Sequence, residues 1–176
     1  MFEVYGIIIS KQGSGRYAKY PDLGVQIKNV WSIFIKYKPT LILDFLEVRK
    51  YMEISSIPVA MNNLKAEDLL VLRQHVNAML ECVESGKPFI KHDRDFHCAL
   101  FSCIGNTIFE QLLTAFWDIC ESADVWPIND DPKRVAQQHI DILEAFACRD
   151  QEKATSLLEQ QFMESRNQIA LALVKN

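Results

Sequence analysis

The chain has 176 residues, of which 49% are hydrophobic and 24% are charged, with only six glycines and six prolines. This composition suits one compact domain with a sizeable core, and it excludes the disordered and collagen-like classes. The formal net charge of −4 gives no overall attraction to phosphate backbones or anionic lipid. Any contact with nucleic acid must therefore be local or made by sequence outside this chain.

The first twenty residues differ in residue pattern from the rest of the chain. The β-branched run Ile7–Ile9 is followed by a short basic stretch with two glycines that ends at Tyr17. This pattern predicts two strands joined by a tight turn. A lone two-stranded ribbon is barely stable in water, so we expect the hairpin to belong to something larger. Its basic residues Lys11, Arg16 and Lys19 are candidates for contacts with phosphates.

Helical spacing of apolar residues dominates the rest of the chain. Proline, glycine and acidic capping residues divide it into seven segments. The expected helices span residues 23–38, 40–63, 66–86, 89–104, 107–123, 133–148 and 151–173. Pro58 is expected to kink the second of them or to open its last turns. The sequence thus predicts an all-α antiparallel bundle of six to seven helices preceded by a short β-hairpin.

The five cysteines are an odd number and lack C-x-x-C spacing, which predicts reduced thiols in a cytoplasmic protein. Cys98 and Cys103 could be proposed as redox sensors or ligands, but small buried apolar residues are the more common use of cysteine. There is no apolar signal core, and the longest apolar runs are too short to span a bilayer. We therefore expect no membrane contact.

Three residues form the candidate metal site. Asp93 and His97 are four apart on an expected helix, so their side chains share one face about 5–6 Å apart. His139, on a later helix, is the candidate third ligand, and such mixed oxygen and nitrogen donors favour zinc, nickel, manganese or iron over calcium. Taken alone, the Asp/His spacing is common on helices. A lone histidine such as His139 is more often a half-buried polar residue than a metal ligand. His75 and His92 are expected at the surface beside charged neighbours.

Several motifs resemble the effector-binding FCD domain of GntR-type transcription regulators, FadR subfamily. They occur in the family's order as the opening helix Phe45–Glu53, Asp93-x-x-Phe96-His97, Ile104-Gly105-Asn106 and His139-x-x-Ile142-Leu143-x-Ala145. Gly6–Tyr17 is similar to the wing of the family's winged helix-turn-helix. The resemblance covers nearly the whole chain.

The resemblance implies a dimeric bacterial regulator whose all-α domain encloses a pocket for a small carboxylate, often with a metal ion. The family's ligands are one aspartate and three histidines, which carry over to Asp93, His97 and His139. The third histidine would fall at Gln161, a neutral and weaker donor. Either zinc, nickel or manganese is held by three strong ligands plus Gln161 or effector oxygens, or the pocket binds its effector through hydrogen bonds without an ion.

Arg49 is the residue expected to bind an anionic effector, because a guanidinium can donate to both oxygens of a carboxylate. The alternative is an ion pair with Glu53, four residues later on the same face. Gln161 is the second candidate for effector contact.

The resemblance also divides the chain into three parts. Residues 1–19 would be a truncated winged-helix remnant, 20–39 a linker helix, and 40–176 the effector-binding and dimerisation domain. The helices that should precede a wing are absent from the sequence. Operator DNA is therefore expected as a partner of the full-length protein only, with Lys11 and Arg16 limited to phosphate contacts.

The favoured function is the ligand-sensing, homodimeric part of a metabolite-responsive transcription regulator, which is not an enzyme. The alternative is a small helical metal-dependent hydrolase whose Asp/His/His cluster activates water, with Asp95 or Glu144 as general base. A third possibility is a dimerisation module without a ligand. A sealed interior lined only by apolar side chains would favour that third possibility.

Overall fold

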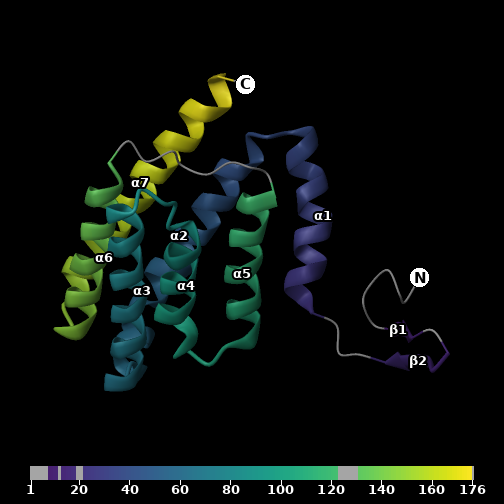
Figure 1. Ribbon diagram of the computed structural model, residues 1–176, viewed down its shortest axis with the longest axis horizontal. Helices are drawn as coiled ribbons and strands as arrows, with labels where there is room; N and C mark the ends of the chain where they lie inside the picture. Colours follow the sequence, from purple (N-terminus) through teal and green to yellow (C-terminus); the bar gives the residue numbers. More distant parts are fainter. Residues whose placement is uncertain (1–7, 12, 19–21, 123–130, 176) are drawn as a thin grey trace.

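A computed structural model describes residues 8–11, 13–18, 22–122 and 131–175 of the chain. Within these residues, two short strands precede seven helices, and the helices form a bundle with α1 at one edge and the hairpin beyond it (Figure 1). The elements are β1 (Ile8–Lys11), β2 (Gly15–Ala18), α1 (Leu23–Tyr37), α2 (Leu41–Asn63), α3 (Ala66–Glu84), α4 (Ile90–Ser102), α5 (Thr107–Ser122), α6 (Pro132–Ala147) and α7 (Gln151–Lys175). The expected fold class is confirmed, and the expected helix ends lie within two residues of the observed ones.

The hairpin has the strand, turn and strand that its sequence predicts. β1 and β2 pair antiparallel, with Ile8 opposite Ala18 and Lys11 opposite Gly15. Gly13 and Gly15 have positive φ angles of 77° and 99°, a conformation that residues with a side chain rarely adopt. The glycines of the basic stretch therefore allow the chain to reverse there.

Capping residues visible in the sequence set the helix starts. Four of them accept a hydrogen bond from the backbone amide three residues later, at the starts of α1, α5, α6 and α7, namely Asp22, Asn106, Asp131 and Asp150. Gly86 and Gly105 follow the ends of α3 and α4 with positive φ. α2 continues through Pro58 to Asn63.

α1 packs along α5 at the outer edge of the bundle (Figure 1). The two helices approach so closely at Gly24 that a Cβ atom there would lie 3.0 Å from the carbonyl oxygen of Gln111. The ring of Trp31 on α1 also meets the ring of Phe45 on α2 edge to face, with centroids 4.0 Å apart. α1 is thus joined to the bundle by side-chain packing as well as by chain connection.

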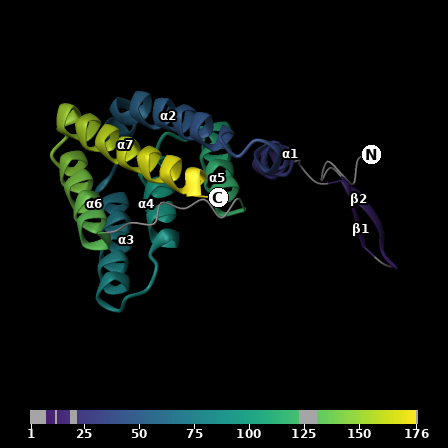
Figure 2. The same ribbon diagram turned by 90° about the horizontal axis from the view of Figure 1, so that it is seen from above.

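The core consists of two apolar clusters. The larger contains Phe96, Phe101, Leu72, Ile142 and Leu158, and the smaller contains Ile35, Ile42, Phe116, Phe162 and Ile169. Seen from above, α2 and α7 lie side by side across the bundle (Figure 2). On the buried face of α2, Arg49 and Glu53 stand between Leu46 of the smaller cluster and Ile57 of the larger. The polar interior thus lies where the two clusters meet.

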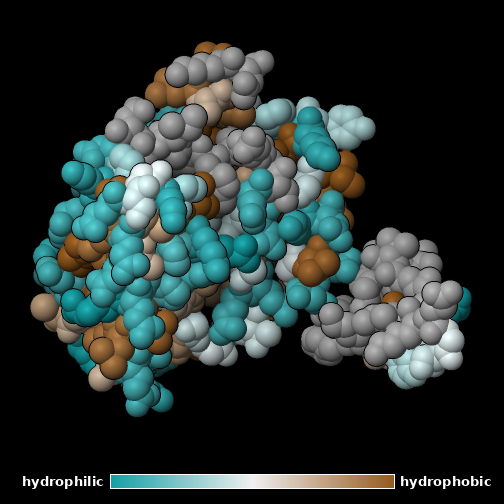
Figure 3. Space-filling model, viewed as in Figure 1, coloured by the Kyte–Doolittle hydropathy of each residue, from teal (hydrophilic) through white to brown (hydrophobic). Residues whose placement is uncertain are grey.

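The surface in view is largely hydrophilic with scattered apolar residues (Figure 3). In the described part of the chain, no helix combines the length and the hydropathy needed to cross a bilayer.

Candidate metal and ligand site

Asp93 and His97 of α4 and His139 of α6 come together in the interior, and we call these three residues the inner cluster. One ligand atom from each lies within 4.8 Å of the others. Oδ1 of Asp93 is 3.1 Å from Nε2 of His139 and 3.5 Å from Nε2 of His97. Packing of α3 against both α4 and α6 holds these two helices in place. The structure therefore brings together the three residues that the sequence singled out.

Hydrogen bonds fix the orientation of both histidine rings. Nδ1 of His139 is 2.8 Å from the carbonyl oxygen of Val135, which can only accept, so this nitrogen carries the proton. Nδ1 of His97 is 2.8 Å from Oε2 of Glu53 and donates to that carboxylate. When Nε2 of either ring is deprotonated, as metal binding requires, its lone pair points toward Asp93. This is the orientation in which histidines of protein metal sites bind their ion.

The carboxylates of this region stay ionised despite their burial. Burial alone raises the pKa of Glu53, but the charges of Arg49 and His97 outweigh it and the pKa falls below its usual value. Burial likewise raises the pKa of Asp93, and here His139, with smaller contributions from His97 and Arg49, brings about a net decrease. Both groups are therefore negative at neutral pH.

Arg49 takes part in an ion pair and also lines a cavity. Its Nε donates to Oε1 of Glu53 at 2.5 Å, so the ion pair expected from the sequence as the alternative role of Arg49 is present. Its guanidinium carbon lies 3.9 Å from the ring centre of Trp117 and 5.2 Å from that of Phe162. Within the described residues, its terminal nitrogens have no hydrogen-bond partner. Arg49 is only 8% exposed and is available to a ligand from the cavity side.

Gln161 lies at the inner cluster, where the resemblance placed it. Its Nε2 is 3.1 Å from Nε2 of His139 and can donate to that nitrogen when the nitrogen is not protonated toward Asp93. A half-turn of the amide would present its oxygen at the same place. Gln161 is thus positioned as a neutral fourth partner of the cluster.

A cavity of about 300 Å³ opens beside these residues. Its polar lining includes Arg49, Asp93, His97, Gln138, Gln161 and Glu164. Its apolar lining includes Leu46, Phe89, Ile90, Trp117, Val135, Phe162 and Ile169. Because charged groups share this cavity, the interior does not fit a dimerisation module with a sealed apolar core.

The residues nominated for hydrolysis do not lie at the inner cluster. Glu144 is exposed on α6, and Asp95 does not line the cavity. The hydrolase alternative therefore lacks the general base that it would need from either residue.

Cys98 and Cys103 fit the interpretation of cysteine as a small buried residue. Burial raises the pKa of Cys98 and of Cys103, and it raises the pKa of Cys120 to about 11. Cys98 and Cys103 both pack against the larger apolar cluster. These two cysteines are therefore protonated packing residues.

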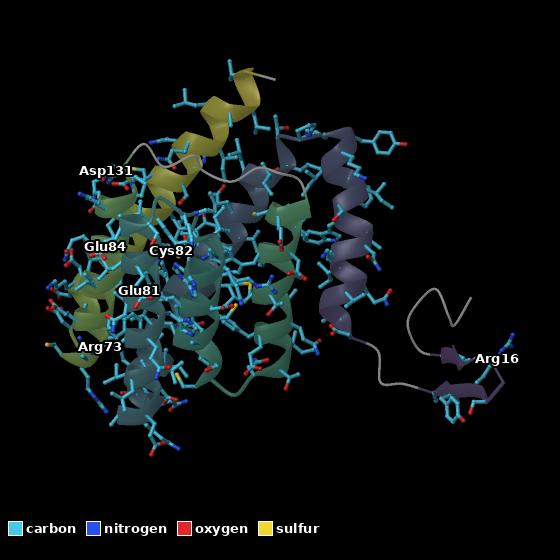
Figure 4. All side chains as sticks on the ribbon, in the orientation of Figure 1. Arg16, Arg73, Glu81, Cys82, Glu84 and Asp131 are labelled. Carbon is cyan, nitrogen blue, oxygen red and sulfur yellow. The ribbon has the colours of Figure 1, made fainter. Side chains whose placement is uncertain are left out.

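The candidate phosphate contacts lie away from the inner cluster. Arg16 is exposed on β2, and Figure 4 shows it on the hairpin beyond α1. Lys11 ends β1, whereas Lys19 lies outside the described residues.

Sequence reasoning missed the second role of Glu53 and the aromatic pair around Arg49. It named Glu53 only as a partner of Arg49, whereas the structure adds His97, 44 positions away. Glu164, which lines the cavity and accepts from Gln138 at 2.9 Å, gave no signal in the sequence.

The family model of the FCD domain matches residues 44–162, which extend from α2 into α7. Over 99 residues the chain is 30% identical to a protein of Micromonospora viridifaciens that carries the name transcriptional regulatory protein NedR, and the match covers 54% of this chain and 70% of that protein. Among solved structures, Streptococcus agalactiae GntR matches with a TM-score of 0.73 at 22% identity, over 94% of this chain and 77% of that one. E. coli McbR/YncC matches with a TM-score of 0.64 at 15% identity, over 97% and 80% of the two chains. At these identities the two structures show a shared fold.

Proposed function

Because this chain belongs to the FCD domain family of GntR-type transcription regulators, we propose that its bundle binds a small organic carboxylate beside Arg49 and one divalent transition metal ion at the inner cluster. Binding transmits a signal, and no bond is made or broken.

One observation carries this proposal. Two histidine nitrogens and one carboxylate oxygen converge beside a cavity that Arg49 also lines. Imidazole and carboxylate donors suit zinc, nickel or manganese, and Gln161 stands where a fourth, neutral ligand would be. When bound, the ion would add positive charge that attracts carboxylate oxygens.

Arg49 supports a carboxylate as the effector. Glu53 holds its Nε, and Trp117 and Phe162 confine its plane, so the guanidinium is already ordered before a ligand arrives. An ordered guanidinium loses little entropy when it binds both oxygens of a carboxylate. The cavity volume of about 300 Å³ and its mainly apolar lining favour a small metabolite with an apolar body.

The placement of the lining residues suggests how binding becomes a signal. They come from α2, α4, α5, α6 and α7, so a ligand that contacts several of them favours the arrangement in which these helices lie close together. Such differential affinity shifts the population of two states. We propose that a cytoplasmic homodimer passes this shift to the parts of the regulator that bind operator DNA.

A thermal-shift screen of chelator-treated protein tests the proposal. Lactate, pyruvate, glycolate, gluconate, citrate and fatty acyl compounds are each added with and without zinc, nickel or manganese. We expect at least one carboxylate to raise the melting temperature, and to do so more strongly with metal. Unchanged melting with every metal and every carboxylate would contradict the proposal.

A further inference from the structure

A second group of metal-capable side chains lies on the opposite side of α4 from the inner cluster. His92 and Asp95 of α4 approach His75 of α3, and one ligand atom of each lies within 4.8 Å of the others. We call His75, His92 and Asp95 the outer cluster.

His75 and His92, expected at the surface beside charged neighbours, lie close to each other and to Asp95. All three residues are half-buried, and the two rings lie 6.5 Å apart between centroids at a tilt of 39°. Across the described ranges 8–11, 13–18, 22–122 and 131–175, none of the three side chains makes a hydrogen bond or an ion pair. Their ligand atoms are therefore not already engaged by another group of the protein.

We propose that the outer cluster is a second binding site for one divalent transition metal ion, independent of the inner cluster. Two imidazoles and one carboxylate are donors that suit zinc, nickel or copper. Ligand atoms of one zinc ion each lie about 2.0–2.2 Å from it, so they cannot be more than roughly 4.4 Å apart. The three ligand atoms lie within 4.8 Å of one another, so small side-chain rotations suffice to reach this limit, and solvent can fill the remaining positions.

An ion at the outer cluster would connect α3 to α4 close to the wall of the ligand cavity. The turn between these helices contributes Lys87 and Pro88 to the cavity lining, and α4 contributes Ile90 and Asp93. Successive residues of a helix point about 100° apart, so the positions 92 and 95 face away from 93 and 97. α4 thus contributes two residues to each cluster, and an outer ion would hold the start of α4 against α3.

The chain has four histidines, and each cluster contains two of them. The histidine signals therefore report on the two sites separately. Chelator-treated chain is titrated with zinc by calorimetry, and the ring nitrogens are followed by NMR. We expect two ions per chain, with the signals of His75 and His92 shifting together. His92→Gln and Asp95→Asn should each weaken the outer site at least tenfold, whereas Lys91→Gln, an exposed neighbour on α4, should leave two ions bound.

His139→Gln separates this proposal from the inner site. It should remove or weaken one ion and leave the zinc-induced shifts of His75 and His92 unchanged. If both outer variants bind zinc like the unaltered chain, and the signals of His75 and His92 do not respond, the outer cluster is not a metal site. Circular dichroism confirms that each variant is folded before the titration.

Discussion

Glu53 and His97 are 44 positions apart in sequence, yet Nδ1 of His97 donates a hydrogen bond of 2.8 Å to Oε2 of Glu53. Glu53 is fully buried and also binds Nε of Arg49 at 2.5 Å. One carboxylate from α2 therefore orients both a candidate metal ligand and the candidate effector-binding residue.

Glu53→Gln is expected to weaken both folding and metal binding. Removing one member of a buried ion pair costs about 3–5 kcal/mol, because Arg49 would keep a buried charge. Loss of the histidine's orienting partner typically lowers metal affinity by roughly 10- to 100-fold. Urea unfolding and zinc calorimetry measure the two effects. Glu47→Gln, exposed on the same helix, is the control, and equal behaviour of the two variants would show that Glu53 does not orient His97.

Arg49→Lys separates charge from geometry at the cavity. Lysine keeps a positive charge near Glu53 but cannot donate in parallel to both carboxylate oxygens. We expect a folded protein whose melting temperature no longer rises with a carboxylate that stabilises the unaltered chain. Lys50→Gln, the neighbouring substitution, should retain the full rise. An undiminished rise in Arg49→Lys would limit this residue to its pair with Glu53.

Gln161→His should strengthen metal binding at the inner cluster. Gln161 already touches Nε2 of His139 at 3.1 Å, so an imidazole there would add a stronger donor. We expect the dissociation constant for zinc or nickel to fall at least tenfold in calorimetry. Gln160→His places the same side chain on an exposed position of α7 and should not tighten the inner site. Equal affinities in both variants would contradict the assignment of Gln161.

Acid should destabilise the metal-free protein through Asp93 and Glu53. Both have pKa values below their usual range in the folded state, so the unfolded chain binds more protons as the pH falls. Their contribution is complete above the usual carboxyl pKa of roughly 4 and is lost as the pH falls through the lower folded values. Urea unfolding between pH 7 and pH 3 should show the loss, and Asp93→Asn should make it shallower. A variant with the same pH dependence would exclude Asp93 as a source.

The fold was predictable because its signals are local. Helical spacing, Pro39 and capping residues such as Asp131 act over a few residues, and they place the helix ends within two positions. The pairing of Asp93 with His97 is equally local, since one helical turn separates them.

The remaining contacts of the interior depend on how helices pack. The approach of Glu53 to His97, and of Trp117 and Phe162 to Arg49, joins side chains from four helices. No spacing in the sequence encodes the rotation of one helix against another. The approach of His75 to His92 was not predictable for the same reason, because only the packing of α3 on α4 brings them together.

Anomalous diffraction at the zinc K edge, from crystals of chelator-treated protein reloaded with zinc, tests the inner cluster most directly. We predict a zinc peak about 2.0–2.2 Å from Nε2 of His97, Nε2 of His139 and a carboxylate oxygen of Asp93. The absence of a peak there, with Gln161 still hydrogen-bonded to His139, would contradict a metal-assisted ligand site in this domain.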